Sequence, residues 1–109
     1  VVATDAYLTK EECQRVAVMA MGGLAQVIRP SFTPFDGDAI FVLAAGKAER
    51  EENDVPGAEL RASLVSEIGC AAQDAVAFAS VDAVKSARQM AGIPSIFDIQ
   101  SDRNPNKKL

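Results

Sequence analysis

The chain has 109 residues, of which 49% are apolar and 6% aromatic, and it carries 11 basic against 15 acidic residues, a formal net charge of −4. This length corresponds to one domain or part of one. The absence of histidine excludes a Ser-His-Asp or Cys-His catalytic arrangement, and a His-ligated zinc, built from this chain. The acidic balance, without a cluster of Lys and Arg, argues against nucleic acid and membrane surfaces as partners.

Hydropathy and the use of cysteine predict where in the cell the protein is located. The longest unbroken apolar run covers residues 39–45, so the sequence predicts no membrane-spanning helix. Cys13 and Cys70 lie far apart in helix-like contexts, which predicts buried, reduced thiols and a cytoplasmic location. The chain begins at Val1 as if within a strand, so we expect that it was trimmed or cut from a longer precursor.

The first half of the chain predicts a strand followed by a helix. Residues 1–4 are strand-like, and Thr9 is followed three residues later by Glu12, a capping-box spacing that marks a helix start. Apolar positions then recur with a helical period until Pro30 ends the helix. Gly22 and Gly23 each cost about 1 kcal/mol relative to Ala, so we expect them to allow close packing of this helix on a sheet.

The second half predicts a loop, a strand, a charged connection and a second helix. Residues 31–38 are a loop by their Pro and Gly content, and residues 39–45 are apolar at every position, which favours a strand covered on both faces. The charged residues over 46–56 predict an exposed connecting loop. A helical pattern starts at Gly57, Ser80 can interrupt it as a new cap, and Gly92 and Pro94 end it. Its predicted apolar face comprises Leu60, Leu64, Ile68, Ala71, Ala72, Ala75 and Phe78.

These elements give an α/β class with a strand-helix-strand-helix unit over residues 1–97 and a polar C-terminal tail over residues 98–109. Two strands cannot bury the apolar stripes of two helices, nor cover each other on both faces. We therefore expect half of a layered α/β fold, completed by a second chain or by residues upstream of Val1.

The compact polar constellation of the sequence is Asp36-Gly37-Asp38, directly ahead of the apolar run. Two buried carboxylates at this spacing repel each other unless donors or a cation satisfy them, so they are candidate catalytic groups. The same triplet is also a common turn, in which Asp accepts backbone N–H groups. A calcium loop is excluded because no further acids follow at the required spacing. We expect neither a metal nor a cofactor.

Three motifs in order resemble a known family: V-A-T-D over residues 2–5, I-R-P over residues 28–30 and D-G-D over residues 36–38. Together with the residues between them, they are similar to the small (β) subunit of L-aminopeptidase/D-esterases and their relatives, the β-peptidyl aminopeptidases and nylon-oligomer hydrolases. The resemblance is strong over residues 1–46 and general in the second helix.

The resemblance implies a self-processed amidohydrolase that acts on peptide or other amide bonds. In such enzymes a Ser or Thr at the new N-terminus of the small subunit is the nucleophile, and its α-amine or a nearby group is the base. The implied fold is a four-layer αββα sandwich, similar to N-terminal-nucleophile hydrolases and ornithine acetyltransferases, shared with a larger α subunit from the same precursor. The implied assembly is (αβ)4.

The resemblance carries Asp36 and Asp38 over as acids near the nucleophile, which itself lies just upstream of Val1 and is therefore not among these residues. Relatives often have His near Met21 and Phe32, and neither position is His here, so the substrate is open between an L-amino-acid amide, a β-peptide and a polyamide oligomer. Two alternatives also stay open: a non-catalytic βαβα binding or assembly module, and an acyltransferase on the same fold.

Overall fold

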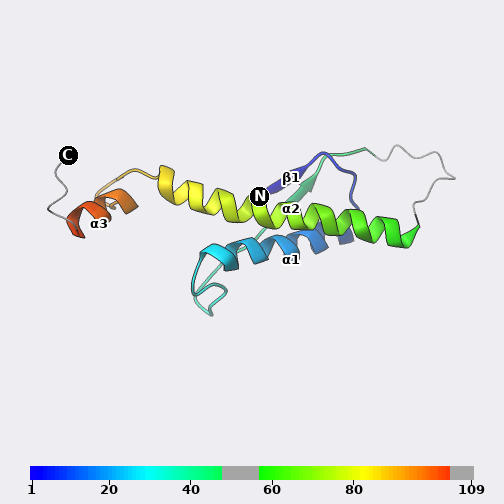
Figure 1. The fold of residues 1–109 in the computed structure, drawn as a ribbon, viewed down its shortest axis with the longest axis horizontal. Coiled ribbons are helices and arrows are strands. Elements are labelled where there is room, and N and C mark those ends of the chain that lie inside the picture. Colours follow the sequence, from blue (N-terminus) through cyan, green and yellow to red (C-terminus); the bar gives the residue numbers. More distant parts are fainter. Residues whose placement is uncertain (48–56, 104–109) are drawn as a thin grey trace.

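A computed structural model describes residues 1–47 and 57–103 of the chain (Figure 1). Within these residues it contains two short strands and three helices. In chain order they are β1 (Val2–Thr4), α1 (Lys10–Val27), β2 (Val42–Ala44), α2 (Ala58–Ser86) and α3 (Ile96–Arg103). The chain is thus a small α/β piece, in agreement with the predicted class.

The two strands pair in parallel, with Val2 opposite Val42 and Thr4 opposite Ala44. Helix α1 makes the crossover that a parallel connection needs. The Val2 amide donates to the Phe41 carbonyl at 2.8 Å, and the Ala45 amide donates to the Thr4 carbonyl at 2.9 Å. The second strand is shorter than the predicted residues 39–45, because β1 offers only three residues for pairing.

One face of this sheet is covered and the other is bare. Val2, Val42 and Ala44 pack against the helices. On the opposite face, the Phe41 and Leu43 side chains are 68% and 61% exposed. The prediction that the second strand is covered on both faces is therefore confirmed for one face only. The uncovered face is apolar.

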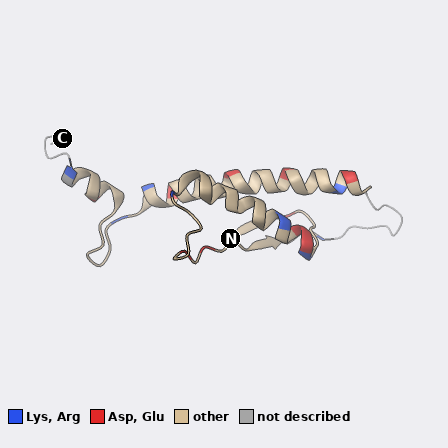
Figure 2. Ribbon diagram, turned by 90° about the horizontal axis from the view of Figure 1, so that it is seen from below, with Lys and Arg blue, Asp and Glu red and all other residues tan. Residues whose placement is uncertain are grey.

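The start and end of α1 follow the predicted signals. The Thr9 hydroxyl accepts the Glu12 amide at 3.3 Å, while the Glu12 carboxylate accepts the Thr9 amide at 2.7 Å, which completes the capping box. The helix ends at Val27, ahead of Pro30. Charged residues gather in the first turns of α1 and α2 (Figure 2), where Glu11 and Glu12 complement the helix dipole of α1.

Helices α1 and α2 pack side by side in the same direction. Contacts run in order along both helices, from Glu12 with Arg61, through Met19 with Gly69, to Gly23 with Gln73 (Figure 1). A Cβ on Gly23 would overlap the Gln73 carbonyl oxygen. The close packing predicted for the glycine pair is confirmed, but its partner is a helix rather than a sheet.

The buried face of α2 agrees with the prediction only in part: Ala72 is buried and Ile68 packs against the core, as predicted. Val65, Gly69 and Ala72 are buried, whereas Leu60 and Phe78 are 66% and 80% exposed. The hydrophobic period could not single out the buried face because α2 is apolar on more than one side, and because a buried glycine does not register as apolar. A helix that is apolar around its circumference is expected where other layers cover it.

By length and composition alone, α2 is the one described helix that could cross a membrane. An 18-residue window reaches a mean hydropathy of 1.3, and 17% of that window is buried within this chain. The longest unbroken apolar run does not reveal this property, because polar residues, among them Glu67 and Asp74, divide the apolar sequence of α2 into short stretches. The same composition suits a helix at the centre of a larger soluble core.

The C-terminal third departs from the predicted layout. Ser80 does not cap a new helix: its hydroxyl donates to the Val76 carbonyl at 2.8 Å, and α2 continues to Ser86. Residues 98–103 belong to α3 rather than to a tail. The Ser95 hydroxyl donates to the Asp98 carboxylate at 2.6 Å at the start of that helix. Residues 104–109 lie outside the described residues.

The core of this piece is small for its length. Its buried apolar residues are Leu8, Val16, Ala20, Val65 and Ala72. The radius of gyration is 19.3 Å, against about 13 Å for a compact domain of this size. The accessible area is 8905 Å², against roughly 5,800 Å² for a compact monomer of this mass. The fold therefore leaves much surface for other polypeptide to cover.

The two cysteines are free thiols. Cys13 is half-buried on α1, but Cys70 is exposed on α2. The predicted burial is therefore wrong for Cys70, because it lies on the side of α2 that this chain does not cover.

Candidate functional site

The predicted acidic triplet lies in the loop between α1 and β2, and both Asp36 and Asp38 are exposed. The Asp36 carboxylate accepts the Thr33 amide at 2.8 Å, and the Asp36 amide donates to the Thr33 carbonyl at 3.0 Å. These two bonds close a turn through Pro34 and Phe35, as Asp does in many turns. Asp36 thus shapes the loop that carries Asp38.

The sheet brings this loop to the N-terminal end of the chain. Parallel strands begin at the same edge of a sheet. Val2 lies opposite Val42, and Asp38 comes shortly before Val42 in the chain. The acidic triplet and Val1 are therefore on the same edge, where the strands begin.

A second polar cluster lies at the opposite edge, where β1 ends. The Arg61 guanidinium donates to both carboxylate oxygens of Glu12 at 2.6 Å and to the Tyr7 carbonyl at 2.7 Å. It also lies over the Tyr7 ring, 5.7 Å from the ring centre. Bidentate pairs of this kind are among the stronger hydrogen-bonded contacts in proteins. One side chain therefore ties α2 to the start of α1 and to the segment after β1.

The electrostatics of this cluster favour the charged pair. Hydrogen bonds from Arg61, aided by the Thr9 amide and the Arg61 charge, lower the pKa of Glu12 to about 2, although partial burial opposes the shift. The bond to Glu12 raises the pKa of Arg61. Both side chains are about four-fifths buried, with 20% of Arg61 and 18% of Glu12 exposed. The pair remains ionised at neutral pH.

Gly46 also packs closely on this segment. A Cβ at this position would overlap the backbone of residues 5–7. The Thr4 hydroxyl accepts the Ala6 amide at 3.1 Å and turns the chain away from the strand. Gly46 and Arg61 thus both contact the segment that follows β1.

Sequence reasoning identified Glu12 only as a helix cap and did not identify Arg61. The two residues are far apart in the chain, and no local pattern links them; the capping box was the one signal that marked Glu12. Across residues 1–47 and 57–103, no group of three or more potential metal-ligating side chains comes together.

Comparisons with known proteins agree with the resemblance seen in the motifs. The sequence model of peptidase family S58 matches residues 1–95. An uncharacterized aminopeptidase of Mycobacterium leprae strain TN is 48% identical over 97 residues, which is 87% of this chain and 27% of that protein. Uncharacterized aminopeptidases of Mycobacterium bovis and Mycobacterium tuberculosis are each 44% identical over 101 residues, 91% of this chain and 29% of theirs.

No solved structure gives a significant match to the chain. The chain spans little more than a quarter of the length of the aminopeptidases that it matches. The family match, however, covers all of β1, α1, β2 and α2. On this evidence, the chain belongs to peptidase family S58.

Proposed function

We propose that this chain is the smaller part of a self-processed hydrolase that cleaves peptide or other amide bonds. Its nucleophile is a Ser or Thr in the residues that directly precede Val1 in the full-length protein. Asp36 and Asp38 act beside that nucleophile, and a larger α subunit from the same precursor completes the fold.

The register of the sheet is the observation that carries this proposal. Because Val2 lies opposite Val42, residues that precede Val1 would run beside the residues that precede Val42. Those residues include Asp38. A side chain just upstream of Val1 and the Asp38 carboxylate are therefore expected at one edge of the sheet, within reach of one substrate.

The chemistry follows from these groups. The hydroxyl of the nucleophile attacks the amide carbonyl and passes its proton to the α-amine or a nearby base, which gives the proton to the leaving amine as the C–N bond breaks. A water molecule then attacks the resulting acyl-enzyme, which releases the carboxylic acid and restores the hydroxyl. Asp38 accepts a hydrogen bond from the hydroxyl or from the α-amine, and Asp36 fixes the turn and adds negative charge that favours a cationic substrate terminus. Oxyanion donors come mainly from the larger subunit.

The uncovered apolar surfaces support the proposal that a larger subunit completes the fold. Phe41 and Leu43 on the bare sheet face are more than half exposed, and the related aminopeptidases are over three times longer than the matched segment. A second sheet from the rest of the precursor, packed on this face, would bury these side chains and give the sandwich architecture.

The first test is the role of the acids in the full-length processed protein. We expect Asp38→Asn to lower kcat/KM on an L-amino-acid amide by about a hundredfold or more, because a hydrogen-bonding group at the reacting atoms contributes on this scale. Asp36→Asn should lower it less, because its amide oxygen can still accept the Thr33 amide. Steady-state kinetics check both values.

Asp5→Asn is the matched control, an exposed aspartate where β1 ends, and it should leave kcat/KM unchanged. Amino-terminal sequencing of the processed small chain should find Ser or Thr a few residues before Val1. If Asp38→Asn left kcat/KM unchanged, the Asp36-Gly37-Asp38 triplet would have only the structural role of a turn. If the full-length chain remained uncut, self-processing would be contradicted.

A further inference from the structure

Six of the seven glycines of this chain have a structural reason within it. A glycine is needed where a side chain would collide with a neighbouring element or where the backbone takes a left-handed φ, and it is common at a helix N-cap. The glycines that lie against another part of the chain are Gly22, Gly23, Gly46 and Gly69. Gly92 has a φ of +80°, and Gly57 is the N-cap of α2.

Gly37 is the remaining glycine, and none of these reasons applies to it. A Cβ there would meet no atom of the described chain within 4 Å beyond the adjacent residues, and its φ lies outside the left-handed range. It also follows the turn rather than forming it, since the bonds that close the turn join Thr33 and Asp36. An alanine would fit this position and lose less conformational freedom on folding. The described residues therefore give no reason for a glycine between Asp36 and Asp38.

The sheet register brings this open position close to the proposed nucleophile. Val2 lies opposite Val42, and the Val2 amide donates to the Phe41 carbonyl at 2.8 Å. Counted back in the same register, Gly37 would lie opposite a residue a few places before Val1. Neighbouring strands of a sheet are about 4.8 Å apart. The Gly37 backbone and the proposed nucleophile are therefore expected to be cross-strand neighbours.

An acyl group on the nucleophile needs room at this place. In the acyl-enzyme the acyl carbon is bonded to the hydroxyl oxygen of the nucleophile, so the rest of the acyl group must extend into the space beside that residue. Glycine is the residue that lets a ligand approach the backbone most closely. Gly37 leaves such a space open on the same edge of the sheet as Asp38.

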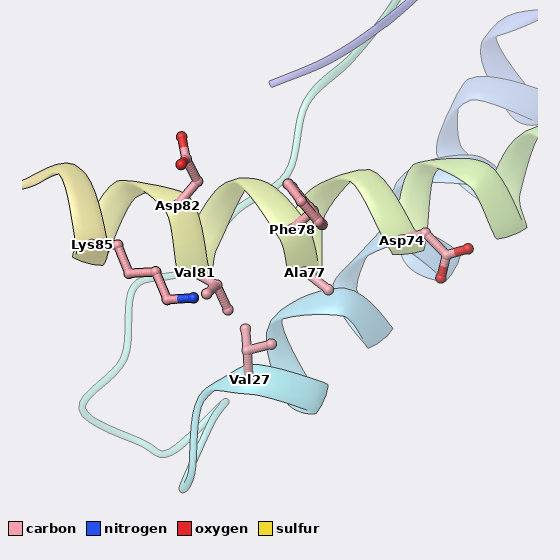
Figure 3. A pocket seen from close by; sticks show the side chains of 7 residues that line it. All are labelled: Val27, Asp74, Ala77, Phe78, Val81, Asp82 and Lys85. Atoms are coloured by element: carbon pink, nitrogen blue, oxygen red, sulfur yellow. The ribbon is translucent and has the colours of Figure 1, made fainter.

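A hollow of about 470 Å³ on the other side of the molecule's helices has no such relation to the reaction. Figure 3 shows it between the end of α1 and the second half of α2; its lining residues are Val27, Asp74, Ala77, Phe78, Val81, Asp82 and Lys85. None of them belongs to β1, to β2 or to the loop that carries Asp38. This hollow therefore gives no indication of the substrate.

We propose that Gly37 is a specificity-determining residue of the reaction: the space left by its missing side chain accommodates the side chain of the acyl part of the substrate. This inference rests on the proposed function, because it needs a nucleophile upstream of Val1, and it adds which position limits the size of the substrate. An alanine at position 37 would put a methyl group in that space. Amides of large amino acids would then be excluded, whereas glycine amide, which has no side chain, would still fit.

Steady-state kinetics of Gly37→Ala in the full-length processed protein test this inference. We expect kcat/KM on L-leucine amide to fall about tenfold or more, because one methylene group in a substrate pocket changes kcat/KM on this scale. The value on glycine amide should stay within about threefold of that of the unmodified protein. A role in folding alone would lower both values together, so the ratio between the two amides decides the question.

Gly57→Ala is the matched control. Gly57 also has open space around its Cα and no left-handed φ, but it lies at the start of α2, where its carbonyl accepts the Arg61 amide. This variant should leave kcat/KM on both amides unchanged. Gly37→Ala should keep the larger subunit, and its free energy of unfolding should not fall, because alanine fits the backbone there.

Equal losses of kcat/KM on the two amides, or no loss on either, would overturn the inference. Loss of the larger subunit or of self-cleavage in Gly37→Ala would also overturn it, because the space at Gly37 would then belong to the rest of the precursor. Asp38→Asn separates this failure from that of the proposed function. If Asp38→Asn left kcat/KM unchanged, the proposed function would fail as well, whereas a loss in Asp38→Asn would confine the failure to Gly37.

Discussion

Arg61 holds together three parts of the chain that the sequence separates widely. It contacts Glu12 at the start of α1 and the Tyr7 carbonyl after β1, and it extends from the second turn of α2. The planar guanidinium makes all of these bonds at once, which the ammonium of a lysine cannot do. The positive charge alone is therefore not sufficient at this position.

We expect Arg61→Lys to lower the free energy of unfolding of the full-length protein by about 1–2 kcal/mol, through loss of the bidentate geometry. Arg15→Lys, on an exposed residue of α1, is the control and should change it by less than about 0.5 kcal/mol. Chemical denaturation measures both. Equal stability of the two variants would show that charge alone suffices.

Glu12 makes this contact dependent on pH. Its pKa is about 2 in the folded chain, against an ordinary value of 4.5, so the folded state favours the ionised form. The stabilisation is present in full above the ordinary value, and it is lost progressively as the pH falls from 4.5 towards 2.

We therefore expect Glu12→Gln to be less stable than the unmodified protein at about pH 6, and the gap to narrow as the pH approaches about 2. Denaturant unfolding of both proteins across this range measures the gap. A gap that is constant with pH would mean that the Glu12 charge does not contribute.

At the scale of elements, the pair of adjacent glycines on α1 offers a contrast. A Cβ on Gly23 meets the backbone of α2, whereas a Cβ on Gly22 meets only the end of the flexible Gln73 side chain, at 3.1 Å. Gly22→Ala gains about 1 kcal/mol of helix propensity, which offsets this mild crowding.

Gly23→Ala should therefore lower the free energy of unfolding by about 2 kcal/mol or more, because α1 must move away from α2, and Gly22→Ala should be near neutral. Thermal unfolding of the two variants in parallel checks the contrast. If both variants lost the same stability, the helix contact would not depend on the close approach at Gly23.

Sequence reasoning reached those elements whose signals are local. The capping box at Thr9 and Glu12, the stop before Pro30 and the turn at Asp36 each depend on neighbours in the chain, and each is found. The buried face of α2 and the partner of Gly23 depend on which elements meet in space. Local spacing does not encode such contacts, so the buried face of α2 was predicted only in part, at Ile68 and Ala72, and Gly23 was given the wrong partner.

The candidate site divides in the same way. Asp36 and Asp38 stood out as a short motif, but their approach to the N-terminal end comes from the sheet register between Val2 and Val42. Arg61 carries no motif and is found only through its contacts. Residue types were thus predictable, whereas the distances between them required the fold.

At the scale of the whole molecule, exposed apolar side chains outnumber the buried ones. Phe35, Phe41 and Phe78 are each more than two-thirds exposed, whereas Val16 is the largest fully buried side chain in the described ranges. So small a core cannot offset the conformational entropy of a chain of this length.

We therefore expect residues 1–109 produced alone to show no cooperative thermal transition and to bind a dye for exposed apolar surface, because nothing covers the bare sheet face. Co-production with the remaining polypeptide should restore a sharp transition. Circular dichroism and dye fluorescence compare the two preparations. A monomeric chain with a sharp transition of its own would contradict the need for a larger fold.

The length of α2 also sets how far apart events at its two ends occur. From Arg61 to Val81, the helix rises about 30 Å, and it is straight enough to act as a rod (Figure 1). At that separation, side chains at the two ends of α2 cannot contact the same small substrate.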